Sequence, residues 1–284
     1  MDKTSPVPQP QTTGVRAVSV RRRGQQLEED LVVVEEPLEI RVDGKPLVVT
    51  MRTPGHDAEL AAGFLFAEGV ISSGREIAAY REKTGTDNGG AQIRVTSFAG
   101  DRIDVRLRDG AERAGVETVE REFRATAACG VCGKEQIEDL HQDLPAIEPA
   151  PFSTTLLEAL PDRLRERQQL FEATGGIHAA GLFALDGTVL CVREDIGRHN
   201  AVDKVIGHFV LSADVPLRER ILVVSGRAGF ELVQKALKAA IPIMVSVGAA
   251  SSVAVDMATT AGMSLYSFAG PGRGNLHVAS DERS

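Results

Sequence analysis

The chain has 284 residues, with 40 acidic against 32 basic side chains, a net charge of −8 and 43% hydrophobic residues. This length suits one large domain or two modest ones, and the acidic balance argues against a general nucleic-acid binder. No apolar run approaches the roughly 18 residues of a membrane span. Residues 1–13 lack the apolar core of a signal peptide, so we expect a cytoplasmic protein with no membrane association.

The first half predicts a smaller α+β unit over residues 15–138, preceded by a disordered leader over residues 1–14. A helix is expected over 58–68, because Leu60, Phe64 and Leu65 recur at helical spacing and Gly69 closes it. Strands are expected over residues 31–34, 38–42, 46–51, 92–96 and 102–107, with the second and third joined at Asp43–Gly44.

The second half changes to alternating strands and helices. Residues 139–172 read as a helical connection, interrupted by Pro145, Pro149 and Pro151. After it, residues 173–284 predict an α/β domain with one central sheet. Its strands are expected over 181–185, 188–193, 221–225, 243–247 and 264–268, and its helices over 200–211, 230–239 and about 252–260.

Two of the three cysteines form the C-x-x-C pair Cys129 and Cys132, and glycines flank the pair. Two thiols at this spacing can reach each other, one metal ion or one sulfur atom in transit. A structural zinc site needs four ligands, and this sequence supplies no second pair, so no metal is expected. Lys134 and the start of a helical pattern at residue 135 would stabilise a thiolate on Cys132. Cys191 lies in an apolar strand and is expected to be a buried core thiol.

Three loops that follow predicted strands carry arginines: 193–200, 225–230 and 268–275. In open α/β sheets such loops share the edge where ligands bind. Their arginines favour an anionic, phosphate-bearing ligand. Each loop also has a plain structural interpretation, as a tight turn, a salt-bridge network or a flexible tail. His178, after Gly175 and Gly176, is another candidate site residue or part of a simple turn.

Several long motifs in order resemble the FdhD family, the accessory sulfurtransferases of formate dehydrogenase. The matching stretches are residues 36–40, 52–55, 59–69, 128–134, 174–180, 193–204, 225–227 and 246–252.

The resemblance implies a cytoplasmic, homodimeric sulfur carrier. A cysteine desulfurase would load sulfur as a persulfide on Cys129, and Cys132 would assist transfer or resolve the intermediate. The sulfur would pass to the bis-guanine-dinucleotide (bis-molybdopterin guanine dinucleotide) molybdenum, or tungsten, cofactor before that cofactor is inserted into formate dehydrogenase. The cofactor would be bound as a client, and guanine nucleotides would mimic it. The resemblance also implies a three-layer second domain similar to the cytidine deaminase fold. The family's cofactor-binding segment corresponds here to Phe268, Ala269, Gly270, Pro271, Gly272 and Arg273.

Three other functions remain to be separated from this one. A zinc nucleoside deaminase needs H-x-E followed by P-C-x-x-C, and His178–Ala180 lacks the Glu. A general thiol–disulfide oxidoreductase is allowed by the cysteine spacing, but no thioredoxin-like βαβ unit surrounds it. The third is a non-catalytic chaperone that only shelters the molybdenum cofactor.

Overall fold

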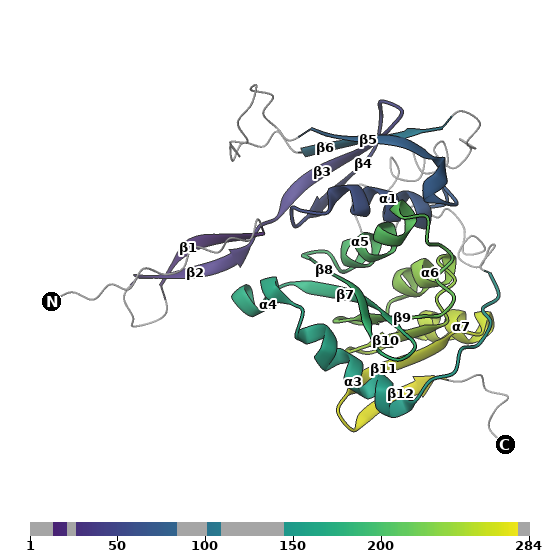
Figure 1. Cartoon of the computed structure of the whole chain (residues 1–284). Coiled ribbons are helices and arrows are strands. Elements are labelled where there is room, and N and C mark those ends of the chain that lie inside the picture. The colour runs from purple at the N-terminus through teal and green to yellow at the C-terminus, as the bar shows by residue number, and fades with distance from the viewer. Residues whose placement is uncertain (1–13, 22–26, 84–100, 109–144, 278–284) are drawn as a thin grey trace, which may run out of the picture.

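The computed structural model describes residues 14–21, 27–83, 101–108 and 145–277. It contains two sheets with helices between them, and a two-stranded ribbon (Figure 1). The predicted α/β class is confirmed for the second half, and the first half is a mixed unit. No helix in the described ranges is long and apolar enough to span a membrane.

The N-terminal unit has a four-stranded sheet in the order β4-β3-β6-β5. The predicted hairpin is confirmed as β3 (Glu36–Val42) and β4 (Lys45–Arg52), and β6 (Asp101–Leu107) pairs parallel with β3. The predicted helix is α1 (Asp57–Ala67). A short 3₁₀ turn, Gly74–Glu76, and β5 (Ile77–Lys83) were not predicted. The strand expected over 92–96 falls in a range that the structure does not describe.

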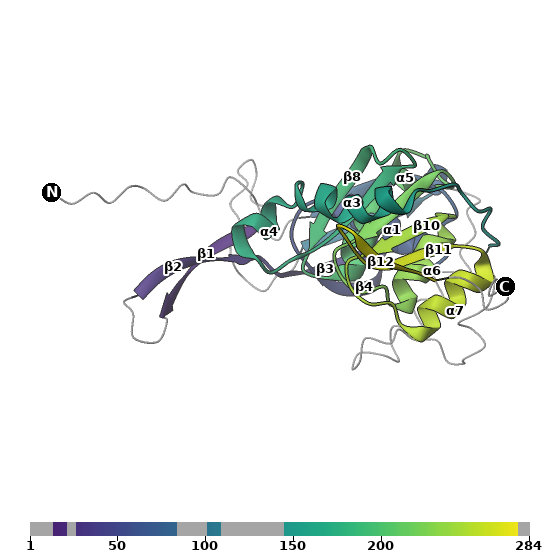
Figure 2. The same ribbon diagram turned by 90° about the horizontal axis from the view of Figure 1, so that it is seen from below.

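A ribbon of β1 (Val15–Arg21) and β2 (Leu27–Val33) extends away from the rest of the molecule (Figure 2). The sequence predicts a strand at 31–34 but gives no sign of β1. Of the leader expected over 1–14, only Gly14 is described, and its carbonyl accepts a hydrogen bond from Val34 N at 2.8 Å. The leader prediction is therefore untested.

The second domain has a six-stranded sheet in the order β12-β11-β10-β9-β7-β8. Its parallel centre is the predicted β-α-β-α-β unit. The parts are β9 (Arg220–Val224), α6 (Phe230–Lys238), β10 (Ile243–Ser246), α7 (Ser252–Ala261) and β11 (Ser264–Gly270). The predicted hairpin before it is β7 (His178–Ala184) and β8 (Val189–Asp195), which lead into α5 (Arg198–Leu211).

The C-terminal segment corrects a prediction. Residues 268–275 were expected as a flexible loop, but Arg273–His277 form β12, which pairs antiparallel with β11. Gly272 adopts a positive φ of 68°, and this lets the chain reverse tightly enough for Arg273 to face Gly270.

The sheet is the middle of three layers. On one face lie α3 (Thr154–Arg165) and, at its end, α4 (Gln169–Thr174); α5, α6 and α7 lie on the other (Figure 1). Alternation along β9 explains this, because Ile221 and Val223 pack in the α3 cluster while Leu222 and Val224 pack in the cluster on the opposite face. The predicted connection over 139–172 is helical only in α3 and α4 within the part described.

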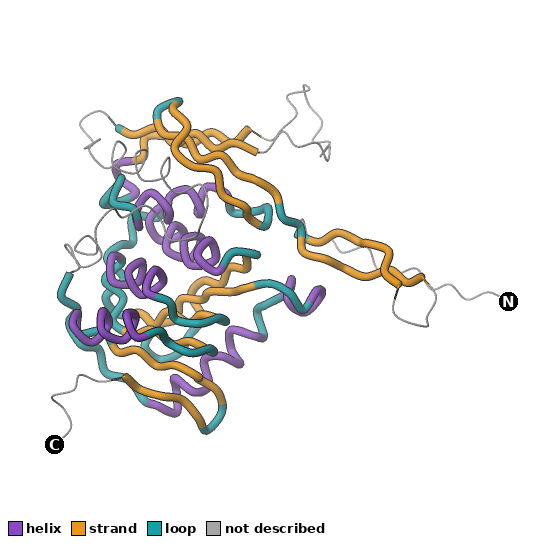
Figure 3. The backbone as a smooth tube through the Cα atoms, turned by 180° about the vertical axis from the view of Figure 1, so that it is seen from behind, coloured by secondary structure: helices purple, strands orange, loops and turns teal. Residues whose placement is uncertain are grey.

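One hydrophobic core joins the two units, because α1 lies against α5 between the two sheets (Figure 3). Two glycines allow this close approach. A Cβ on Gly207 would lie 1.8 Å from Glu59 O, and one on Gly63 would lie 1.9 Å from Asp203 O. Any side chain at either position would force the helix backbones apart, so the close packing of α1 on α5 depends on both glycines.

Candidate functional site

Backbone hydrogen bonds connect the loops that follow β9 and β10 at one edge of the sheet. Gly248 N donates to Gly226 O at 2.9 Å, and Ala228 N donates to Ala249 O at 3.0 Å. The next strand joins them, because Phe268 N donates to Gly248 O at 3.1 Å. The predicted sharing of one sheet edge is confirmed here for the loop after β9 and for Phe268, and residues 247–251, which were not among the predicted loops, join them in a single row.

Phe268 is held in an unusual conformation at this edge. Its φ is 54°, in the left-handed region, and it sits where the β11–β12 register shifts. Its side chain is 49% exposed, although Ala269 and Gly270 beside it are buried. Left-handed backbone costs a non-glycine residue about 1–2 kcal/mol. A strained, outward-facing aromatic ring is typical of a ligand-contacting position.

The arginines of the candidate loops divide into two groups. Arg198, Arg227 and Arg273 are exposed at the sheet edge and form no salt bridge with any described residue. Arg193 instead forms a two-pronged contact with Glu59 of α1, with Nη2 2.7 Å from Oε1. Burial opposes ionisation of Glu59, but hydrogen bonds from Arg193, His56 and His208 hold its pKa well below the usual range. Arg193 is therefore part of the joint between the units.

The loop after β8 is fixed by buried polar contacts. Asp195 is fully buried and lies 2.7 Å from Lys204 Nζ, which also donates to Thr53 O at 2.8 Å. Asp195 further accepts hydrogen bonds from Thr53 N, Gly197 N and Asn200 Nδ2. These contacts bring the sequence motifs 52–55 and 193–204 together, and they fix Arg198 at the start of α5.

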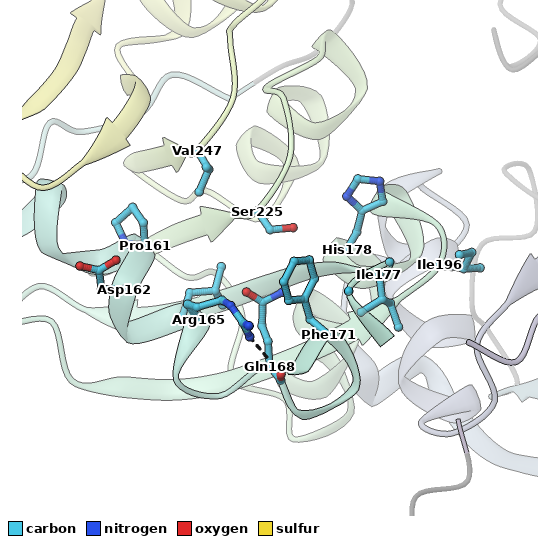
Figure 4. A pocket seen from close by; sticks show the side chains of 13 residues that line it. Pro161, Asp162, Arg165, Gln168, Phe171, Ile177, His178, Ile196, Ser225 and Val247 are labelled. Atoms are coloured by element: carbon cyan, nitrogen blue, oxygen red, sulfur yellow. Dashed lines mark hydrogen bonds between the residues drawn. The ribbon is translucent and has the colours of Figure 1, made fainter. Parts of the chain in front are cut away.

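His178 begins β7 at the same edge, beside Ser225 (Figure 4). A Cβ on Gly226 would lie 3.4 Å from His178 Nδ1, so the glycine leaves room for the imidazole ring. Burial lowers the pKa of His178, and the nearby Arg198 and His199 side chains lower it further. The ring is therefore uncharged near neutral pH and can both donate and accept a hydrogen bond.

The structure describes one of the three cysteines, Cys191. Cys129 and Cys132 fall outside the ranges that the structure describes, so their predicted roles are untested. Cys191 is 5% exposed, and burial raises the pKa of its thiol to about 11. The prediction of a buried core thiol is thereby confirmed. Among the described residues, no group of three or more His, Cys, Asp or Glu could hold a metal ion.

Comparison with known proteins identifies the family. The model of the FdhD/NarQ family matches residues 33–283, which is most of the chain. The chain belongs to the FdhD/NarQ family. The family covers both the N-terminal unit and the six-stranded domain, so the two units form one family architecture.

Two individual relatives carry the name of the same family. The chain is 48% identical over 247 residues to a protein of Corynebacterium efficiens named sulfur carrier protein FdhD, with 87% of each chain covered. It is 45% identical over 259 residues to a Mycobacterium tuberculosis protein of the same name, with 89% of this chain and 91% of the relative covered.

A solved structure supports the fold. It is that of a candidate formate dehydrogenase accessory protein from Desulfotalea psychrophila, which superposes with a TM-score of 0.68 and 23% identity. The match covers 94% of this chain and 97% of that one. The likeness to the cytidine deaminase fold stays a prediction.

The sequence does not predict the residues that line one side of the site. Arg165, Gln168 and Phe171, at the junction of α3 and α4, line a cleft together with His178 and Ser225 (Figure 4). They lie in the polar connection over 139–172, where no motif or spacing marks them. Only the packing of α3 on the sheet brings them to the edge.

Proposed function

We propose that this chain is a sulfur carrier that receives sulfur from a cysteine desulfurase and passes it to the bis-guanine-dinucleotide molybdenum cofactor of formate dehydrogenase. The observation that carries the proposal is a C-x-x-C pair in a chain 48% identical to a protein named sulfur carrier protein FdhD. In this proposal the chain acts as a sulfurtransferase and Cys129 holds the sulfur.

One round of transfer uses the two thiols and the donor, and a thiol reductant must restore both thiols before a second round. The Cys129 thiolate attacks the outer sulfur of the desulfurase persulfide, the S–S bond of the donor breaks, and the desulfurase thiolate leaves. Attack of the Cys132 thiolate on the inner sulfur of the Cys129 persulfide then releases hydrosulfide and leaves a Cys129–Cys132 disulfide. Both steps balance, because each new S–S bond replaces one that breaks.

The sheet edge supplies features suited to the cofactor as cargo. Arg198, Arg227 and Arg273 are exposed cations, and α5 and α6 begin in these loops, so the positive ends of two helices lie near them, which suits pyrophosphate. Phe268 offers a ring face for stacking on a guanine. Within the proposed segment, Ala269 and Gly270 are buried, so they would shape the strand while Phe268, Pro271, Gly272 and Arg273 face the cargo.

The proposal includes partners and a setting. The client is formate dehydrogenase, the donor is a cytoplasmic cysteine desulfurase, and two copies of the chain form a homodimer. The names of the relatives support a sulfur-carrying role; the metal, the client and the dimer are parts of the proposal.

A non-catalytic chaperone is the alternative, because the ligand-binding features of the sheet edge do not involve the cysteines. Activation of formate dehydrogenase in cells that lack their own copy of this protein separates the two. We expect C129A and the double variant C129A/C132A to leave formate dehydrogenase as inactive as in cells with no copy. C191A is the matched control, because that thiol is buried and protonated, and it should retain activation. Full activation by the double variant would establish the chaperone instead.

A further inference from the structure

Helix α4 lies beside the site at the sheet edge, yet little within the helix holds it in place. It has six residues, Gln169–Thr174, and none of them is buried. Its N-cap residue, Gln168, makes no side-chain bond to the start of the helix. Arg165 of α3 pairs with Glu172 at 2.7 Å, but both side chains are exposed, so the pair adds little. Because helices this short are marginal in water, contacts with other elements must fix α4.

The first of these contacts comes from Glu194, near the end of β8. Its carboxylate accepts hydrogen bonds from Leu170 N and Phe171 N, both at 2.8 Å. N–H groups in the first turn of a helix have no acceptor within that helix. Glu194 therefore acts as a helix cap that is supplied by another element, and it holds the start of α4 against the sheet.

The second contact comes from the base of the ribbon, where both β1 and β2 lie against α4 (Figure 1). Gly14 O accepts the bond from Val34 N that closes this base. A Cβ on Gly14 would lie 3.0 Å from Leu170 Cδ1 and 3.1 Å from Thr53 Cγ2. The glycine backbone thus lies directly against α4, and a side chain at this position would push Leu170 away.

The two contacts belong to one connected structure. Side chains at consecutive positions of a strand point to opposite faces of the sheet. Glu194 accordingly bonds to α4, while the next residue, Asp195, accepts a bond from Thr53 N of the N-terminal unit at 3.2 Å. Thr53 in turn lies against Gly14. The end of β8 and the base of the ribbon therefore hold α4 from two sides.

The site depends on where α4 lies. Phe171 lines the cleft at the sheet edge, and Gly175 and Gly176 join the end of α4 to the segment that carries His178 (Figure 4). A shift of α4 would move Phe171 directly and His178 through these two residues. Neither Glu194 nor Gly14 lines the cleft, so each can act on the site only through α4.

We propose that Glu194 and Gly14 are positioning residues for the sheet-edge site, because they fix α4 and thereby raise the affinity of the site for its cargo. A wall that is fixed before binding loses little entropy when the cargo arrives. The ribbon then contributes to cargo binding although it extends away from the sheet edge. The proposal rests on the proposed function, since cargo binding is one readout, but the order of α4 can be measured without any cargo.

Hydrogen exchange of the backbone amides in the full-length chain measures the order of α4 directly. E194A removes both acceptors, so exchange at Leu170 and Phe171 should become at least about tenfold faster. G14V should speed the same exchange by crowding Leu170. The double variant G14V/L170A makes room for the new side chain, so it should exchange as L170A does. E166A, at an exposed glutamate of the neighbouring turn, is the matched control and should exchange as the wild type does.

Calorimetric titration with GDP, a guanine nucleotide that serves as the probe for the cargo, measures the effect on the site. E194A and G14V should weaken GDP binding by about tenfold, which is within the usual range of coupling between two sites. G14V/L170A should bind GDP as L170A does, and E166A as the wild type does. A merely structural role would lower stability in urea but leave the GDP affinity of the folded protein unchanged.

Unchanged exchange of α4 in E194A and G14V, faster exchange with unchanged GDP affinity, or no GDP binding by the wild type at millimolar concentration would overturn the proposal. Sulfur loading of Cys129 is measured on the same preparations. Failed loading of the wild type, with GDP affinity that still depends on Glu194 and Gly14, would reject the sulfur-carrier function and leave the positioning role standing. Normal loading with GDP affinity that is unchanged in both variants would reject the positioning role alone.

Discussion

The contact between α1 and α5 and the exposed edge of the six-stranded sheet are built from the same residue types and use them in opposite ways. At the contact, Arg193 pairs with Glu59 of α1, the buried pair Asp195–Lys204 bonds to the backbone of Thr53, and glycines bring the helices together. At the edge, Arg198, Arg227 and Arg273 face solvent, and Phe268 is held outward at a positive φ. Paired charges therefore support the contact between the two units, whereas the arginines at the site form no salt bridge with a described residue.

The comparison also explains why one motif serves both regions. In residues 193–204, Arg193, Asp195 and Lys204 bind the N-terminal unit, whereas Arg198 stands exposed between them. The fixed residues hold the exposed one in position. Substitutions in the two regions should therefore separate stability from function.

The largest effect on stability is expected for K204M. Lys204 is 1% exposed and lies 2.7 Å from the buried Asp195, so its removal leaves a carboxylate without a cation in the interior. Breaking a buried pair in this way costs about 3–5 kcal/mol. Urea unfolding should show this loss, and K238M, at an exposed lysine of the same domain, should lie within about 0.5 kcal/mol of the wild type.

A neutral partner should restore part of the loss. The double variant D195N/K204M removes both charges, so it should be more stable than K204M alone. If K204M unfolds within about 1 kcal/mol of the wild type, the buried pair that supports the two bonds to Thr53 of the N-terminal unit adds little stability, and the contrast between the regions fails.

A smaller effect with an unusual sign is expected at Phe268. Because its φ is 54°, F268A keeps a Cβ in left-handed backbone while F268G does not. F268G should therefore be more stable than F268A by about 1 kcal/mol, the reverse of the usual order of these two residues in strands. Urea unfolding of the two variants measures the difference. Equal stabilities, or a more stable F268A, would show that the position is not strained.

The fold of the second half was predictable because its signals are local. The apolar runs at 221–225 and 243–247 and the helical spacing at 200–211 and 230–239 correspond to β9, β10, α5 and α6 within a few residues. The meeting of the post-strand loops followed from the order of these elements alone. The β12 strand was missed because a short segment of Gly, Arg and Asn gains its strand geometry only by pairing with β11.

The candidate site was predictable only in part, because its residues depend on distant contacts. Nothing in the sequence distinguishes Arg193 from Arg198. In the structure Arg193 bonds to Glu59 of α1 and so helps to join the two units, whereas Arg198 is exposed. No sequence feature predicts that Gln168 is buried at the cleft, because its burial depends on where α3 and α4 lie against the sheet. The role of Cys129 stays a prediction from motif and family.

Intact-protein mass spectrometry tests the central claim, that this chain carries sulfur on Cys129, most directly. The wild type, C129A and C132A would each be incubated with an active cysteine desulfurase and cysteine, and then treated with or without reductant. The account predicts a gain of one sulfur atom on the wild type that reductant removes and that is absent from C129A. No added sulfur on the wild type, or an equal gain on C129A, would contradict it.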